Sequence, residues 1–460
     1  MKENIDITAL TGGLKGNVIQ PKDNSYDESR KIWNAMIDCK PALIVQVTGA
    51  DDVSSAIKFA RANKLDITIR GAGHNIAGNS ICNDGLMIDF SGMKKTRVDV
   101  ANKIAFVEPG ATLKDFDEEV QKHGLATPVG INSTTGIAGL TLGGGFGWLT
   151  RKYGMTVDNL LSVEIVTVDG KILRASENEN SDLFWAIRGG GGNFGIVTEF
   201  EFKLHSVGPE ILAGLLVFPL NQAKNILQHY KNLILTTPHE FNTWVVLRKA
   251  PPLPFLPEGV HGKEVVVLAA FYAGESNEGE ALIDKMRGFG DLYGEMVGRM
   301  PYVNWQQAFD PLLTPGGRNY WKSHNFKELS DDALDLMIQY AGKLPSPQCE
   351  IFIACLEGKI NSIPEDAMAY SSRDVKFILN VHGRWDDAAQ DKECIDWARE
   401  FFNATSKFAS SGAYVNFMTE EEQERVMKAY GPNYNKLVQI KKKYDPDNLL
   451  KHNQNIKPSV

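Results

Sequence analysis

A histidine and an asparagine stand inside a glycine-rich segment in the first hundred residues. The segment, Arg70–Gly78, has the sequence RGAGHNIAG and follows the apolar strand pattern LDITIR. Glycines at this place allow successive backbone N–H groups to converge on an anion such as a pyrophosphate. On its own, His74 is most simply interpreted as an ordinary loop histidine satisfied by backbone hydrogen bonds.

Two further glycine-rich clusters and one polar cluster stand out in the sequence. The segment Pro128–Trp148 contains seven glycines, Arg188–Gly195 reads RGGGGNFG, and Asn453–Asn455 is a polar cluster near the end of the chain. A single cluster would be most simply a tight turn. Three glycine clusters in the first 200 residues instead indicate close approach of the backbone to a large flat ligand.

A nicotinamide dinucleotide site is the obvious alternative. Gly190, Gly192 and Gly195 formally match G-x-G-x-x-G, which in a Rossmann unit follows a strand and opens a helix. Here the match follows the helical pattern SDLFWAIR and precedes the strand pattern IVTEFEF. The context is inverted, so the sequence argues against a Rossmann domain.

The elements that must position these clusters fall into three regions. Residues 37–205 alternate short strands and helices, including a Thr-capped helix that ends at Gly124 and a hairpin that turns at Asp169–Gly170. From 206 to about 410, longer strand patterns with helices between them predict an antiparallel sheet covered on one face. From 414 onward two helices precede the polar tail. The fold class is therefore predicted as α+β with two domains.

Bulk properties exclude several classes of partner. The net charge of −8 argues against nucleic acid and anionic membranes. The segment Met1–Gly16 lacks the apolar core of a secretory signal, and the longest apolar stretch, Ile211–Leu220, is about half of a membrane span. Five scattered cysteines with no CxxC favour a reducing compartment and no metal site. We expect a cytoplasmic monomer or homodimer that acts on a small molecule.

The motifs together resemble one family of flavoproteins. RGAGHNIAG, TGIAGLTLGGGFGWLTRKYGMTVDNLLSVEIVTVDG and DLFWAIRGGGGNFGIVTEFEF resemble the FAD-binding domain named after para-cresol methylhydroxylase. The tail, YGPNYNKLVQIKKKYDPDNLLKHNQNIKP, is similar to the C-terminal element of berberine-bridge-type enzymes in the vanillyl-alcohol-oxidase superfamily. The resemblance implies an FAD-binding domain at 1–205, a substrate domain at 206–413 and a C-terminal element at 414–460 that returns to the FAD domain.

The resemblance also implies how FAD is held. In the family, the histidine of the R-[SG]-[GA]-G-H-N motif is bonded to the flavin 8α-methyl group, and that histidine corresponds to His74. Many relatives add a cysteinyl link, but Ala126–Gly130 contains no cysteine, so His74 is expected to be the single covalent link. Cys82 is interpreted as a small buried residue. The remaining predicted FAD contacts are Arg70, Gly71, Ala72, Gly73, Asn75, Gly78, Gly130, Ser133, Thr134, Gly136, Gly139, Gly143, Gly144, Gly147, Gly195, Val197 and Asn453.

Candidate catalytic residues follow from the same resemblance. Tyr414 matches a tyrosine that in many relatives helps to deprotonate the substrate, although an unshifted pKa of about 10 makes tyrosine a poor base without help. Glu350 is the candidate carboxylate partner, Phe352 is the alternative occupant of that position, and Asn416 could orient either group. The simplest interpretation of Glu350 remains a solvated strand carboxylate. Trp148 and Tyr153 are candidates to line the flavin ring.

Three functions remain open at this point. The first is an FAD-dependent oxidase that takes a hydride from a C–H next to oxygen or nitrogen of an alcohol, amine or sugar-like substrate and reduces O2 to hydrogen peroxide. The second is a flavin dehydrogenase with another acceptor. The third is a flavin- or ligand-binding protein without turnover.

Overall fold

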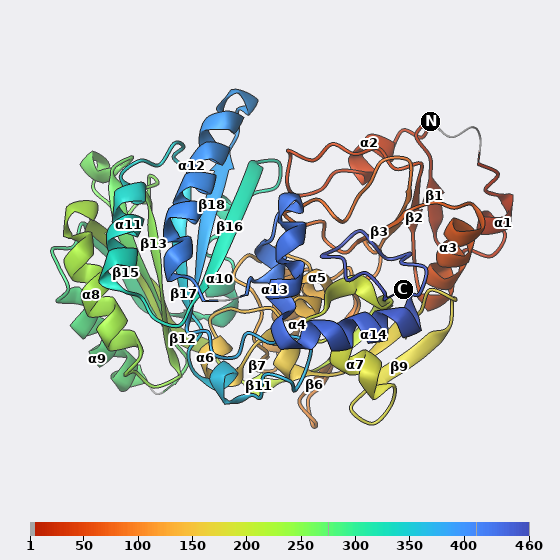
Figure 1. The fold of residues 1–460 in the computed structure, drawn as a ribbon. Coiled ribbons are helices and arrows are strands. Elements are labelled where there is room, and N and C mark those ends of the chain that lie inside the picture. The colour runs from red at the N-terminus through yellow and green to blue at the C-terminus, as the bar shows by residue number, and fades with distance from the viewer. Residues whose placement is uncertain (1–4, 275, 411, 460) are drawn as a thin grey trace.

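The computed structural model describes residues 5–274, 276–410 and 412–459. The first four residues of the segment that was predicted to be no secretory signal, and residue 460 of the predicted tail, lie outside the described residues. Figure 1 shows two regions side by side, with the N-terminal strands on one side and a large sheet on the other. Helices and antiparallel sheets are both prominent, which confirms the α+β fold class.

The N-terminal region contains three sheets. The first has the order β1-β2-β4-β3, in which β2, β4 and β3 run parallel and β1 is antiparallel. The second has the order β5-β6-β10-β8-β9 and is antiparallel throughout, and β7 pairs with β11. Their strands are β1 Asn17–Ile19, β2 Leu43–Gln46, β3 Ile67–Arg70, β4 Leu86–Asp89, β5 Thr96–Asp99, β6 Ile104–Val107, β7 Leu125–Ala126, β8 Leu160–Val166, β9 Ile172–Ser176, β10 Ile196–Lys203 and β11 His205–Ser206.

The predicted Thr-capped helix of this region begins where the sequence predicts. Helix α4 follows Thr112, whose side chain accepts a hydrogen bond from the backbone N of Asp115, and the predicted hairpin is β8–β9 with Gly170 at φ +80°. The helix ends at Gln121, three residues before Gly124. The helices are α1 Thr8–Thr11, α2 Tyr26–Ser29, α3 Ala50–Ala62, α4 Leu113–Gln121, α5 Ile137–Leu142, α6 Thr150–Tyr153 and α7 Ser181–Ile187.

A seven-stranded antiparallel sheet dominates the second region. Its order is β15-β12-β14-β13-β17-β18-β16, so the middle of the sheet brings together strands that are about 100 residues apart in the sequence. The strands are β12 Glu210–Pro219, β13 Phe241–Lys249, β14 Glu264–Tyr272, β15 Gly294–Pro301, β16 Arg318–Phe326, β17 Glu350–Cys355 and β18 Phe377–Trp385.

Alternation along each strand divides this sheet into two faces. Val245 and Leu247 of β13 join the core beneath the helices, whereas Trp244, Val246 and Arg248 point to the other face and line a cavity. Helices α8, α9 and α11 lie on the outer side in Figure 1. The helices of this region are α8 Ala223–Ile234, α9 Ser276–Arg287, α10 Tyr302–Gln306, α11 Asp331–Ala341 and α12 Asp391–Thr405.

The C-terminal segment returns to the N-terminal region. Helices α13 (Val426–Tyr430) and α14 (Tyr434–Tyr444) pack into the same core as β6, β8 and β10, and Figure 1 shows them crossing that region. The Lys441 ammonium donates to the backbone O of Asn193 at 2.9 Å, and the backbone N of Ile456 donates to Asn193 Oδ1 at 3.0 Å. The third glycine cluster therefore anchors the tail. None of the described helices is both long and apolar enough to cross a membrane.

Candidate active site

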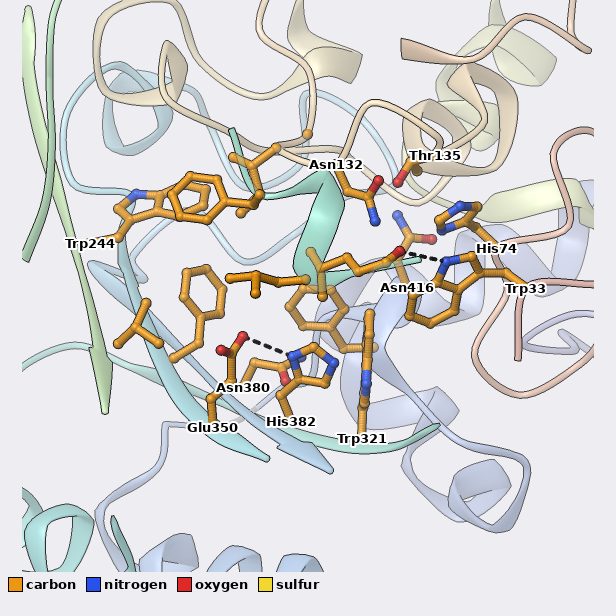
Figure 2. Close-up of a pocket in the computed structure, with 18 of the residues that line it drawn as sticks. Trp33, His74, Asn132, Thr135, Trp244, Trp321, Glu350, Asn380, His382 and Asn416 are labelled. Atoms are coloured by element: carbon orange, nitrogen blue, oxygen red, sulfur yellow. Dashed lines mark hydrogen bonds and ion pairs between the residues drawn. The ribbon is translucent and has the colours of Figure 1, made fainter. Parts of the chain in front are cut away.

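A cavity of about 310 Å³ lies between the glycine loops and the free face of the seven-stranded sheet. Figure 2 shows His74 and Trp33 on one side of it and Glu350, Asn380 and His382 on another. The cavity is mostly apolar with a few convergent polar groups, as small-molecule and cofactor sites usually are.

The first glycine cluster turns its backbone toward this cavity. Gly71, Ala72, Gly73, His74 and Asn75 all line it, and the backbone N–H groups of Ala72 to Asn75 donate to no residue that the structure describes. Gly73 has φ +72°, a conformation that side chains rarely adopt. Unpaired backbone N–H groups of a glycine loop beside a cavity can bind an anion, so the loop fits the pyrophosphate of a dinucleotide.

The second glycine cluster closes over the first. A Cβ on Gly136 would lie 2.9 Å from the backbone N of Ala72, so only glycine permits this approach. Gly130, Gly136 and Gly139 line the cavity, and a Cβ on Gly139 would meet nothing within 4 Å, because that position faces open space. The two loops together form a cradle for a flat ligand.

His74 is held in one tautomer by this cradle. Its Nε2 lies 2.9 Å from Thr134 Oγ1, and that hydroxyl donates its proton to Asn132 Oδ1 at 2.8 Å. A hydroxyl has a single proton, so Thr134 accepts from His74 Nε2–H, and the lone pair of the imidazole lies on Nδ1. Burial, aided by the charge of Arg384, lowers the pKa of His74 to about 3. The ring is therefore neutral at physiological pH, which suits a nucleophile.

One stacking contact, itself supported by a cation, orients the His74 ring. Trp33 stacks on it with the ring centroids 4.9 Å apart, and the Arg384 guanidinium lies 5.3 Å from the Trp33 ring centroid. The Trp33 indole N–H donates to the backbone O of Leu313 at 3.1 Å. Residues from both regions of the chain thus position His74.

The sheet face contributes a charged row of three residues. Arg248 Nη1 donates to Glu350 Oε2 at 2.8 Å, and Glu350 Oε1 lies 3.0 Å from His382 Nδ1. The Glu350 side chain is only 14% exposed, so the interpretation as a solvated carboxylate is wrong. Burial alone would raise the pKa of Glu350, but Arg248 and His382 outweigh it and lower this pKa.

His382 is the chemically available member of this row. Glu350 is ionised and accepts from Nδ1–H, so the lone pair of the His382 ring lies on Nε2. Nε2 is buried, has no hydrogen-bond partner among the described residues, and belongs to a side chain that lines the cavity. Trp321 holds the ring edge-on at 4.6 Å between centroids. A histidine that is oriented by a carboxylate, lines a cavity and keeps its second nitrogen unpaired is a candidate general base.

Tyr414 and Asn416 form a second polar group on the cavity wall. The hydroxyl of Tyr414 accepts from the backbone N of Gly145 and from Asn416 Nδ2, both at 3.0 Å, and Asn416 also donates to the backbone O of Leu140. Burial raises the pKa of Tyr414 to about 12, although both hydrogen bonds act in the opposite direction. A raised pKa makes this tyrosine a hydrogen-bond donor rather than a base.

The predicted site residues divide into those on the cavity wall and those behind it. On the wall lie Gly71, Ala72, Gly73, His74, Asn75, Gly130, Gly136, Gly139, Trp148, Glu350, Phe352, Tyr414 and Asn416. Absent from the wall are Arg70, Gly78, Ser133, Thr134, Gly143, Gly144, Gly147, Tyr153, Gly195, Val197 and Asn453.

Several residues behind the wall support it. Arg70 forms a buried ion pair with Asp89 at 2.7 Å, and Tyr153 stacks on His205 at 3.8 Å. A Cβ on Gly143 would lie 2.1 Å from Asn416 Oδ1, and one on Gly195 would lie 2.8 Å from the Ile165 side chain. Their contacts to FAD remain predictions.

Sequence reasoning missed several residues of the wall, among them Arg248, His382, Asn380, Trp321 and Trp33. Arg248 lies directly across from Glu350, and Glu350 directly across from His382, in the register of β13, β17 and β18. Period-2 alternation could have placed Asn380 and His382 on one face of β18. The strand register that places them next to Glu350 cannot be predicted from the sequence of any single segment.

Comparisons with known proteins identify the family of this chain. A family model described as "FAD binding domain" matches residues 41–176, and one described as "Berberine and berberine like" matches residues 413–457. An FAD-linked oxidoreductase of Dictyostelium discoideum is 33% identical over 449 residues, with 97% of this chain and 95% of the relative covered. (R)-6-hydroxynicotine oxidase of Paenarthrobacter nicotinovorans is 29% identical, with 97% of each chain covered.

Solved structures show the same fold over the whole chain. The crystal structure of 6-hydroxy-D-nicotine oxidase from Arthrobacter nicotinovorans matches with a TM-score of 0.88 and 26% identity, with 99% of this chain and 100% of that chain covered. Berberine bridge enzyme from Eschscholzia californica matches with a TM-score of 0.87 and 21% identity, with 98% and 99% covered. The chain belongs to the FAD-linked oxidoreductases of the berberine-bridge-like, vanillyl-alcohol-oxidase-type flavoprotein family.

Proposed function

We propose that this oxidoreductase is an oxidase with FAD attached to His74, acting on a small alcohol, amine or sugar-like molecule at a C–H bond next to oxygen or nitrogen. Bound FAD supplies the electron acceptor, since flavin N5 takes a hydride and O2 is the final acceptor, giving hydrogen peroxide. The observation that carries the proposal is the pair Glu350–His382, which lines the same cavity as His74 and in which the buried His382 Nε2 has no hydrogen-bond partner among the described residues.

His382 is the group that removes a proton from the substrate. Its Nε2 accepts the proton of a substrate O–H or N–H, and Glu350 stabilises the imidazolium that results. Arg248 keeps Glu350 ionised in its buried position. Removal of this proton makes the substrate a better hydride donor. The positive charge that forms on His382 stays in the row, next to Glu350 and Arg248.

Tyr414 and Asn416 orient rather than deprotonate. Gly145 N–H and Asn416 Nδ2 already donate to the Tyr414 oxygen, so its own proton is left to donate into the cavity. We propose that this proton holds a substrate or cofactor oxygen in place. We therefore keep Tyr414 as a candidate site residue but change its role. It donates a hydrogen bond and does not take a proton from the substrate.

On the other side of the cavity, His74 provides the attachment point. The Nδ1 lone pair is the one left by the hydrogen bond between Nε2 and Thr134, so Nδ1 is the atom that would hold the flavin 8α carbon. The unpaired N–H groups of Ala72–Asn75 would hold the pyrophosphate. We further propose the division into an FAD domain (1–205), a substrate domain (206–413) and a returning tail (414–460).

Acid precipitation and reduction test this function. A yellow pellet is expected from the wild type, and a colourless pellet from His74→Ala, with His239→Ala as a control at a half-exposed histidine. A colourless wild-type pellet would contradict covalent attachment. In an anaerobic panel of alcohols, amines and sugars, at least one member should bleach the flavin, and air should restore the colour at once. Slow reoxidation would indicate a dehydrogenase, and no bleaching by any member would contradict the substrate class.

A further inference from the structure

The cavity continues past the charged row into an apolar arm. This arm is formed by the free faces of β12, β13 and β14 and by the loop 250–262, and the residues that define it are Val217, Val246, Val267, Ala250, Leu253 and Leu256. Among the described residues of β12, β14 and this loop, every side chain that lines the cavity is apolar. Apart from Trp244 and Arg248 of β13, the side chains of the arm therefore offer no hydrogen-bond partner to a bound ligand.

Strand register aligns the arm with the reactive end. Asn380, Phe352, Val246, Val267 and Val217 stand directly across from one another on β18, β17, β13, β14 and β12. All five line the cavity, so the register forms one continuous row from a polar end to an apolar end. With neighbouring strands about 4.8 Å apart, the apolar part from Phe352 to Val217 extends over about 14 Å.

The loop 250–262, which covers the arm, is held in place by its own hydrogen bonds and prolines. The backbone N of Ala250 donates to Lys263 O, and the backbone N of Gly262 donates to Ala250 O, both at 2.8 Å, which closes the loop at its base. The backbone N of Leu256 donates to Leu253 O at 3.0 Å, and the segment Pro251–Pro257 contains four prolines that restrict its backbone. A preformed apolar channel binds an apolar group without a cost of ordering the protein.

We propose that the substrate is amphiphilic, with its oxidisable alcohol or amine at His382 and Asn380 and an unbranched apolar tail along Val246, Val267 and Val217. This inference rests on the proposed function for the assignment of the reactive end. It narrows the substrate class, because a sugar would place hydroxyl groups against a wall that cannot pair with them, and each unpaired buried hydroxyl is costly.

A chain-length series tests the arm without turnover. Binding of 1-butanol to 1-decanol to the dithionite-reduced holoenzyme is measured by titration calorimetry. The dissociation constant should fall about fourfold for each added methylene through the whole series, because an extended decyl chain is shorter than the arm. Val217→Phe shortens the arm by about one strand spacing, or about four carbons, so in this variant the dissociation constant should stop falling near 1-octanol.

Two further variants keep the result interpretable. Met296→Phe, at an exposed position of the neighbouring edge strand β15, should leave the whole series unchanged. If Val217→Phe does not fold, Val267→Thr should weaken binding of decanol about tenfold and leave butanol within twofold.

Affinity that does not depend on chain length in the wild type, or tighter binding of cellobiose than of decanol, would overturn the proposal. These outcomes are separate from failure of the proposed function. That failure would appear as purified protein without flavin or as a flavin that no substrate reduces, whereas the length dependence is measured on binding alone.

Discussion

The two walls of the cavity are built in different ways. The loop wall comes mainly from two glycine-rich segments that present backbone groups and a single histidine to the cavity. The sheet wall comes from side chains on six strands, and its charged row joins Arg248, Glu350 and His382 across a span of 134 residues. The loop wall is suited to a constant cofactor and the sheet wall to a substrate that differs between relatives.

Separate roles for the two walls mean that damage to one should spare the other. The largest expected effect is on turnover. His382→Gln removes the basic nitrogen but keeps a polar side chain, so kcat should fall by roughly 10²–10⁴, the usual contribution of a general base. Flavin content should be unchanged. Steady-state oxidation under air, with Glu210→Gln as an exposed control on β12, measures this. Loss of flavin together with activity would contradict the separation of roles.

The charged row itself can be broken at Arg248. Arg248→Met leaves Glu350 buried with less compensation, which should cost about 3–5 kcal/mol of stability at neutral pH. The Glu350 pKa is held down by Arg248 and His382 in the wild type, so its contribution to stability is present above its unfolded pKa and is lost as the pH falls through the folded pKa.

In Arg248→Met the Glu350 pKa should rise. The pH at which the stability contributed by Glu350 is lost, and the acidic limb of the rate profile, should both move to higher pH. Thermal unfolding and kcat/KM between pH 4 and 8 check both effects. An unmoved acidic limb would exclude Glu350 as the group that this limb reports.

The junction between the walls holds a buried carboxyl group. Gln306 of α10 donates to Asp117 Oδ2 at 2.9 Å and to the backbone O of Gly130 at 3.1 Å. Burial raises the pKa of Asp117 to about 7. The folded state therefore binds this proton more tightly than the unfolded state, and stability falls as the pH rises toward about 7.

Asp117→Asn should remove this dependence and raise stability at pH 8 by on the order of 1–3 kcal/mol. Urea unfolding at pH 5 and at pH 8 gives the comparison. A variant that is less stable than the wild type at pH 8 would show that the carboxylate has an ionic partner there.

The smallest expected effect concerns the hydrogen bond that fixes the His74 tautomer. Thr134→Val keeps the shape of the side chain but removes the acceptor for Nε2–H. The reactive tautomer of His74 should therefore lose about 0.5–1.5 kcal/mol of stabilisation. Covalent incorporation of FAD into apoprotein should slow by about three- to tenfold, while alkanol binding at the sheet wall stays the same. Thr135→Val, beside it on the cavity wall, is the matched control.

The sequence was informative where chemistry is local. RGAGHNIAG and the glycines after Pro128 could be interpreted because each is one stretch of chain whose backbone must approach a ligand. Glu350 was named but thought to be solvated, since the charges that bury and pair it come from β13 and β18. Trp33 had no signal at all, because its contact with His74 depends on how a loop before β2 folds over the cradle. Side chains that meet through register or through long loops cannot be paired from one sequence.

We propose that His74 carries the flavin on the loop wall, whereas His382 on the sheet wall deprotonates the substrate. The most direct measurement is the mass of the denatured wild-type protein, followed by mapping of the modified peptide. We expect one FAD for each chain, attached to the peptide that contains His74, and the bare chain mass for His74→Ala. A bare mass for the wild type, or a flavin mapped to any other residue, would contradict it.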